Sequence, residues 1–201
     1  MKEINPADYV LVRDRDSMLY LAKQRSFYGI NWENQLYKLS ERKGFRPNIR
    51  DFVDLVLLLE SNKSIYDGNG KKISVLEKKE ILDDIKELKE PWRGEYFDNR
   101  FFDYLGNMFM GTGHRIISGK IRPSIIKIVN LIEKDGYIRF SDLDEDGLAK
   151  KVGEGNIFCC YPRDGTVARF VADSVWANLD CSRIPTGSIA DLGVREAREK
   201  I

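Results

Sequence analysis

The C-terminal stretch from Phe158 to Arg198 constrains the fold most, because regular alternation there is mixed with residues that packing does not explain. Side chains alternate with a period of two in 167–172 and again in 177–182, which is typical of β-strands. We therefore expect two strands that each bury one face. The residues expected to point inward are Val167, Phe170, Ala177, Leu179, Cys181, Leu192 and Val194.

A turn is expected before the first of these strands. Pro162, Asp164 and Gly165 are residue types that turns favour, and apolar residues precede them. The sequence therefore predicts a hairpin between Phe158–Tyr161 and Thr166–Val171.

A second set of C-terminal side chains fits no core pattern, and an exposed Trp with exposed Ile residues in loops favours a contact surface. Trp176 is expected to contribute most to binding, because aromatic anchors dominate binding energies, although a place in the core is the alternative. The predicted ligand-contacting residues are Cys159, Val175, Trp176, Asn178, Asp180, Ser182, Ile184, Thr186, Ile189 and Asp191, with Phe158, Cys160, Asp173 and Glu196 as weaker candidates.

The run YPRDGTVARF, followed by ADS, ANLDC, SRIP and LGVREAR, resembles the C-terminal variable region of diversity-generating retroelement proteins, in particular their archaeal branch. The resemblance covers roughly the last quarter of the chain and is weaker around PWRGEYFDNRF. It implies a variable region over about residues 157–198, in a gene whose adenines are mutated by an error-prone reverse transcriptase. Cys159 and Cys160 depart from the aromatic residues that the family tends to have at these positions.

The resemblance also implies a fold and a function. The fold would be α+β and C-type lectin-like, distantly similar to formylglycine-generating enzymes, with N-terminal helices in residues 1–90 and the lectin-like domain in residues 91–201. The function would be non-catalytic binding of a variable protein or glycan on another cell or virus, with the chain at a cell surface or on a virion. The alternatives are a structural virion or surface-layer component and a cysteine-dependent enzyme related to formylglycine-generating enzymes.

The first ninety residues contain three patterns typical of helices. We expect helices over Asn31–Arg42, from an Asn48 cap to about Ser61, and over Ser74–Leu88, where Ser74 and Glu77 match a capping box. The stretch 9–12 indicates a strand, whereas 19–21 is grouped with the helical segments. These helices would either pack on the lectin-like domain as a layer or form a small accessory domain.

The middle of the chain is rich in aromatic and branched residues. A cluster between Trp92 and Tyr104 could stack on sugars or bases, but its dispersed charges favour a core where helices meet a sheet. The segment Ile121–Ile132 fits either a helix or an edge strand, because Pro123 near its start suits both. Residues 137–140 are expected to form a short strand.

Charge and hydropathy exclude two classes of partner. Lys and Arg total 33 against 32 Asp and Glu, so no global field attracts nucleic acid. The N-terminal residues MKEINPADYVLVRDRDS lack an apolar core, and no apolar run reaches the length of a membrane span. We therefore expect no nucleic-acid partner, no signal peptide and no membrane insertion.

Three acidic residues match the opening of a calcium loop. Asp142, Asp144 and Asp146 alternate as in such loops, but Lys150 is ninth and Gly153 is twelfth, where a bidentate Glu is required. An acidic surface loop is the better interpretation.

Neither histidine nor cysteine forms a recognisable catalytic motif. His114 stands alone in GTGHR, without a base partner or zinc ligands at suitable spacing. Adjacent Cys159 and Cys160 would be strained as a disulfide, although one could in principle reach Cys181, and three reduced thiols are favoured. We expect no catalytic residue, no metal and no cofactor.

Overall fold

The computed structural model describes residues 4–14, 18–86, 93–130, 134–172 and 176–201. Over these residues the fold is α+β, as predicted, with one large sheet and three α-helices. The helices are α1 (Trp32–Glu41), α2 (Ile49–Glu60) and α3 (Val75–Lys86), with short 3-10 turns at Pro6–Asp8 and Phe140–Asp142. The strands are β1 (Tyr9–Asp14), β2 (Met18–Ser26), β3 (Arg93–Tyr104), β4 (Asn107–Thr112), β5 (Arg115–Ile117), β6 (Lys120–Arg122), β7 (Ile125–Ile128), β8 (Gly136–Ile138), β9 (Ile157–Cys160), β10 (Val167–Ala172), β11 (Ala177–Arg183) and β12 (Leu192–Arg198).

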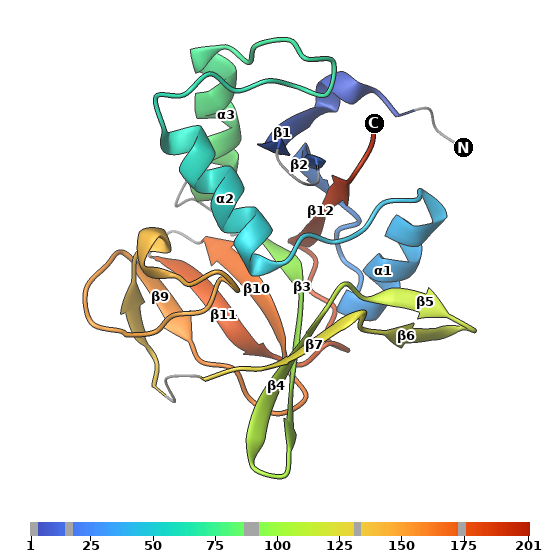
Figure 1. Ribbon diagram of the computed structural model, residues 1–201, viewed down its shortest axis with the longest axis vertical. Helices are drawn as coiled ribbons and strands as arrows, with labels where there is room; N and C mark the ends of the chain where they lie inside the picture. Colours follow the sequence, from blue (N-terminus) through green and yellow to red (C-terminus); the bar gives the residue numbers. More distant parts are fainter. Residues whose placement is uncertain (1–3, 15–17, 87–92, 131–133, 173–175) are drawn as a thin grey trace.

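The large sheet joins both ends of the chain. Its ten strands run in the order β1-β2-β12-β3-β10-β11-β9-β8, while β4 pairs with β3 and β7 pairs with β4. The last strand, β12, therefore lies between β2 and β3, and Figure 1 shows both chain ends on the same side of the molecule. Strands β5 and β6 form a separate hairpin.

Local capping explains where helices α2 and α3 begin. The Asn48 side chain accepts a hydrogen bond from the Asp51 backbone and Asp51 accepts one from the Asn48 backbone, so α2 opens on a complete capping box. For α3, Ser74 Oγ accepts from the Glu77 backbone at 3.1 Å, but the Glu77 carboxylate pairs with Lys23 instead of completing the box. All three predicted helices are confirmed within the described residues.

The stretch 19–21 belongs to a strand, so its helical interpretation was wrong. Leu19 and Leu21 are buried, whereas Tyr20 between them is only half-buried. This alternation has a period of two, and β2 pairs antiparallel with both β1 and β12. The predicted strand over 9–12 is confirmed as β1.

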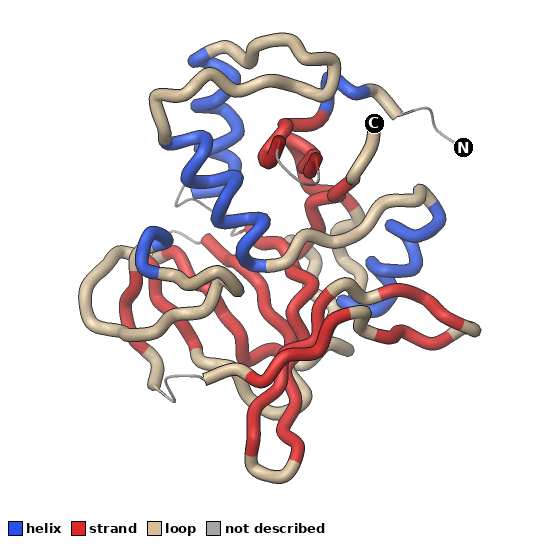
Figure 2. The backbone as a smooth tube through the Cα atoms, in the orientation of Figure 1, coloured by secondary structure: helices blue, strands red, loops and turns tan. Residues whose placement is uncertain are grey.

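Helix α2 covers one face of the sheet and forms the main core with it (Figures 1 and 2). The Phe52 ring lies 4.8 Å from Phe97 and 5.2 Å from Phe170, measured between ring centroids. Burying each of these side chains stabilises the fold by roughly 1.5–3 kcal/mol. Helix α2 therefore packs on the sheet as an integral layer.

A smaller cluster occupies the other face of the sheet. It consists of Trp32, Tyr96, Val167 and Leu192, with Ile189 packed against it. Val167 and Phe170 are buried in different clusters, because side chains alternate along β10 and positions 167 and 170 point to opposite faces of the sheet. Six of the seven residues predicted to point inward are buried, and the seventh, Ala177, is half-buried against the main core.

The predicted hairpin between Phe158–Tyr161 and Thr166–Val171 does not form. Strand β10 has β3 on one side and β11 on the other, so neither edge is open to β9. Strand β9 instead pairs in parallel with β11 and antiparallel with β8. The parallel pairing of β9 with β11 aligns Cys159 with Leu179, and both side chains are buried in the main core.

The structure of the middle of the chain shows which of the predicted elements form there. The aromatic residues Tyr96, Phe97 and Phe101 are buried, as expected, while Tyr104 is exposed and Trp92 lies outside the described residues. Segment 121–132 contains strand residues up to Ile128, so its edge-strand alternative holds there. In 137–140, residues 137 and 138 belong to β8, and Phe140 begins a 3-10 turn.

Within the described ranges, no helix combines the length and the apolar character that a membrane crossing requires.

Candidate ligand-binding face

Partly exposed side chains form a row across four neighbouring strands. Tyr137 is opposite Phe158 in the β8–β9 pair, and Phe158 is opposite Asn178 in the β9–β11 pair. Asn178 is in turn opposite Val171 of β10. Residues opposite one another share a face of the sheet, so this row lies on the side away from the main core.

Aromatic rings stack along this row. The Phe158 ring lies 5.4 Å from Tyr137 and 5.0 Å from Trp176, and the Cys160 sulfur lies 3.8 Å from Asn178 Oδ1. We call Tyr137, Phe158, Cys160, Trp176 and Asn178 the aromatic face. Trp176 leaves 39% of its surface exposed, so it combines ring support with access to solvent. Such rings supply a large apolar contact area with a polar edge.

Five more predicted contacts follow the aromatic face along the chain, and all five are exposed or half-buried. Ser182 is half-buried on the same strand as Asn178, and Ile184 and Thr186 are exposed in the following loop. Ile189 and Asp191 are half-buried, and Ile189 packs against the Trp32 cluster. Val175 and Asp173 lie outside the described residues.

Asp180 was predicted to be outward and open, but it is buried in an ion pair. Its Oδ2 lies 2.8 Å from Arg169 Nη2, and its Oδ1 accepts hydrogen bonds from the Ser182 backbone and hydroxyl at 2.9 and 2.7 Å. Burial opposes the charge of this carboxyl, but the bonds from Ser182 and the Arg169 guanidinium outweigh burial and hold its pKa below the usual value. Asp180 therefore stabilises the sheet and is not an open contact.

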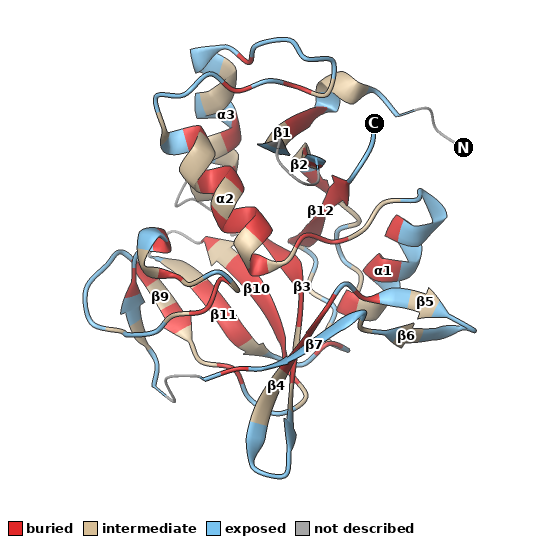
Figure 3. Ribbon diagram, in the orientation of Figure 1, coloured by how far each residue is buried: buried red, intermediate tan, exposed pale blue. Residues whose placement is uncertain are grey.

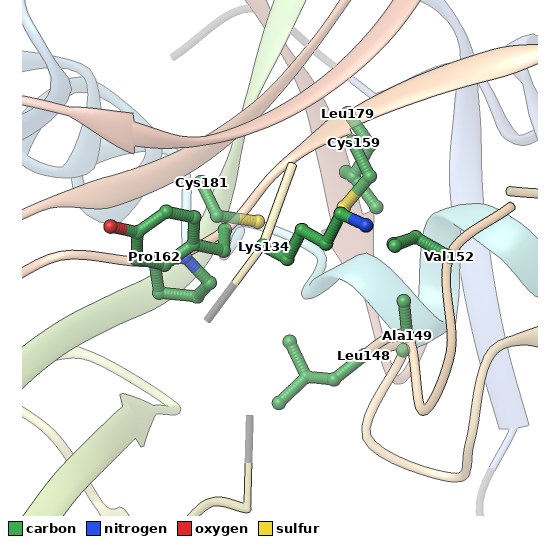
Figure 4. A pocket seen from close by; sticks show the side chains of 10 residues that line it. Lys134, Leu148, Ala149, Val152, Cys159, Pro162, Leu179 and Cys181 are labelled. Carbon is green, nitrogen blue, oxygen red and sulfur yellow. The ribbon is translucent and has the colours of Figure 1, made fainter. Parts of the chain in front are cut away.

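Cys159 was also predicted to contact ligand, but it belongs to the main core. Burial raises the pKa of its thiol to about 12, and burial raises the pKa of Cys181 as well. Both thiols line a cavity of about 20 Å³ beneath the sheet, shown in Figure 4 with Lys134 and Leu148. That volume has room for about one water molecule. All three cysteines are free.

Glu196, a weaker candidate, is buried as well. Its carboxylate pairs with Arg198 and lies 3.9 Å from Arg42. The prediction that Glu196 contacts ligand is therefore wrong.

His114 has a partner that sequence reasoning missed. Its Nδ1 lies 2.8 Å from Asp98 Oδ1, and its backbone N–H donates to Asp98 Oδ2 at 2.9 Å. The imidazole also meets the Trp32 ring edge-on at 5.0 Å. No local spacing links positions 98 and 114, because β3 and β4 bring them together only in the folded chain.

The acidic loop is held by its own backbone. Asp144 accepts hydrogen bonds from the backbone of Asp146 and Leu148 at 3.0 and 2.9 Å, and Asp146 pairs with Lys127. These hydrogen bonds form a turn that the Asp144 side chain closes. In the part of the chain that the structure describes, no three His, Cys, Asp or Glu side chains are grouped to hold a metal ion.

Tyr137 is the member of the aromatic face that the sequence did not single out. Only the β8–β9 register brings it beside Phe158.

Comparison with models of protein families, with curated proteins and with solved structures finds no match for this chain.

Proposed function

We propose that this chain is a binding protein of the diversity-generating retroelement variable type, with a C-type lectin-like fold. Its ligand is a protein or glycan on another cell or virus, and its changeable contacts are the aromatic face and the loop through Thr186. One observation carries this proposal. Asn178 and Ser182, both predicted to vary, are half-buried on β11, whose backbone pairs with β10 and with β9, while Trp176, Ile184 and Thr186 are exposed just outside this strand.

The sheet holds the backbone of β11 in place whichever side chains its exposed face carries. Strand β11 is hydrogen-bonded to β10 and β9, and Leu179 and Cys181 anchor its other face in the core. Replacing Ser182 would remove a hydrogen bond to the buried Asp180 carboxylate, whereas replacing Asn178 leaves both ladders and the core in place. Surface substitutions of this kind usually change the free energy of unfolding by less than about 0.5 kcal/mol.

The cysteine chemistry supports binding over catalysis. A cysteine nucleophile reacts as the thiolate, so active sites lower its pKa. Here burial raises the pKa of Cys159 and of Cys160. Both thiols therefore stay protonated at neutral pH, which disfavours the cysteine-dependent enzyme.

The first test is to sequence many copies of the gene and its neighbourhood from one population. We expect substitutions at Trp176, Asn178, Ser182, Ile184 and Thr186, on adenines of a nearby and nearly identical template. The buried positions Leu179 and Asp180 should stay constant. A C-terminal region as invariant as helix α3 would overturn the proposal.

A second test asks whether the fold tolerates substitutions at the exposed positions, whether or not the gene varies in nature. One displayed library varies Asn178, Ile184 and Thr186, and a matched library varies the buried Leu179, Cys181 and Val194. We expect most members of the first library to stay folded and protease-resistant, and few of the second. Equal losses in both libraries would show that the exposed set is not a permissive surface.

A further inference from the structure

Strands β3, β4 and β7 form an extension of the sheet that carries an apolar face. The Phe102 and Phe109 rings stack at 5.7 Å, and Tyr104 meets Phe109 at 6.3 Å. In the β4–β7 register, Phe109 is opposite Ile128 and Gly111 is opposite Ile126. We call Phe102, Tyr104, Phe109, Ile126 and Ile128 the β7 face. Ile126 and Ile128 are 56% and 63% exposed, and every residue of β7 is exposed (Figure 3).

The outer edge of β7 has no strand beside it among the described residues, because β7 pairs only with β4. The Val129 N–H donates to the Met108 carbonyl at 3.0 Å, so these two residues form a hydrogen-bonded pair. Such pairs alternate along an antiparallel ladder, so Lys127 and Ile125 also bond to β4. The N–H and C=O groups of Ile126 and Ile128 therefore point to the outer edge.

We propose that β7 pairs antiparallel with β7 of a second copy of this chain around a two-fold axis at Lys127. Ile126 of each copy then exchanges both backbone hydrogen bonds with Ile128 of the other. Residues opposite each other share a face, so the two β7 faces join into one continuous apolar surface. The pairing is isologous, which closes the assembly at two copies.

Charge complementarity favours this occupant over an unrelated extended peptide. A lysine on an edge strand normally discourages pairing, and the two Lys127 side chains would lie opposite each other. Each Lys127 Nζ, however, lies 2.5 Å from Asp146 Oδ1 of its own chain. Two Lys127 and two Asp146 side chains then alternate around the two-fold axis, so the aspartates offset the repulsion between the two lysines. A foreign strand would have to supply both this charge pattern and two matching apolar residues.

The test is sedimentation velocity over a concentration series reaching about 100 µM, because self-association follows mass action. The wild-type chain should approach twice its mass of 23.2 kDa. Ile126→Lys and Ile128→Lys should each raise the dissociation constant by at least about tenfold. The matched control is Ile117→Lys, because Ile117 of β5 is also 56% exposed but lies outside β7, and it should leave the dimer intact.

Two further readouts make the test specific to this register. Amide exchange at Ile126 and Ile128 should slow on dimerisation, while Lys127, already bonded to β4, serves as the internal control. Asp146→Asn should weaken the dimer, because it leaves the two lysines unbalanced. A wild-type monomer at the highest concentration would overturn the proposal, as would a dimer that both Lys variants leave unchanged. The outcome does not depend on the proposed function.

Discussion

At the scale of single residues, the Arg169–Asp180 pair holds two strands together directly beside the aromatic face. Both side chains are buried, and the pair bridges β10 and β11 with Ser182 completing the carboxylate's hydrogen bonds. The alternating pattern correctly predicts that Asp180 points to the same face as Asn178. It does not predict whether neighbouring side chains cover that position. A buried carboxylate requires a partner, and its partner lies on the neighbouring strand.

Asp180→Ala should therefore lower the free energy of unfolding by about 1.5–3 kcal/mol, because it removes the carboxylate that pairs with Arg169 and accepts two hydrogen bonds from Ser182. Urea denaturation at neutral pH measures this. Asp191→Ala is the control, since Asp191 is half-buried and was predicted to vary in the same way, and it should cost less than about 0.5 kcal/mol. A comparable loss in both variants would contradict the structural role of Asp180.

The same carboxyl predicts a pH dependence. Its pKa in the folded state lies below the value of about 3.9 expected when unfolded, so its contribution is complete above that pH. The contribution is lost as the pH falls through the lower folded pKa. The gap in melting temperature between wild type and Asp180→Asn should therefore be largest near pH 7 and shrink below about pH 4. A gap that stays constant down to pH 2 would contradict this assignment.

Thiol accessibility gives a second prediction at this scale. Cys160 is half-buried on the aromatic face, whereas Cys159 and Cys181 are buried in the core. We expect iodoacetamide at mildly alkaline pH to label the native protein slowly, and at Cys160 first, as mass spectrometry of peptides would show. Cys160→Ser should remove this early labelling. Early labelling of Cys159 would mean that β9 is not packed as described.

At the scale of elements, helices begin where local side chains cap them. The α2 cap is complete, so Asn48→Ala should cost about 1 kcal/mol of stability, measured by chemical denaturation. Asn34→Ala changes the same residue type at an exposed position inside α1 and should cost nothing or stabilise slightly. A larger loss for Asn34 than for Asn48 would contradict the capping role.

The helices and the strands β10 and β11 could be predicted because their signals are local. Caps lie within three residues of one another, and alternation is visible along a single strand. The partner of β9 could not be predicted in this way, because a turn at Pro162–Gly165 favours a hairpin whichever strand already occupies the neighbouring edge. The burial of Cys159 and the addition of Tyr137 to the aromatic face follow from that same pairing. Sequence alone thus could not predict which side chains are exposed at positions where the strand order decides exposure.

At the scale of the whole molecule, the first and last strands support each other. β12 is flanked by β2 and β3, and Arg195 is buried against Glu95 while its guanidinium donates to the Ala22 carbonyl at 2.7 Å. The helix α2 supplies Phe52 to the core under β10. Residues 91–201 therefore depend on the first ninety residues for both a strand and a core layer.

We accordingly expect a fragment of residues 91–201 to lack a cooperative thermal transition. Adding a separate fragment of residues 1–90 should restore part of it, as circular dichroism would detect. A fragment 91–201 that melts cooperatively alone would show that the C-terminal segment is an autonomous domain.

The parallel pairing of β9 with β11 also has a consequence for evolution. It places position 158 directly against position 178, although twenty codons separate them in the gene. The effect of changing either side chain then depends on its neighbour, so the two positions are epistatic. Scanning one codon at a time would underestimate what this surface can achieve, whereas copying errors that alter both codons in one event explore combinations that stepwise mutation rarely reaches.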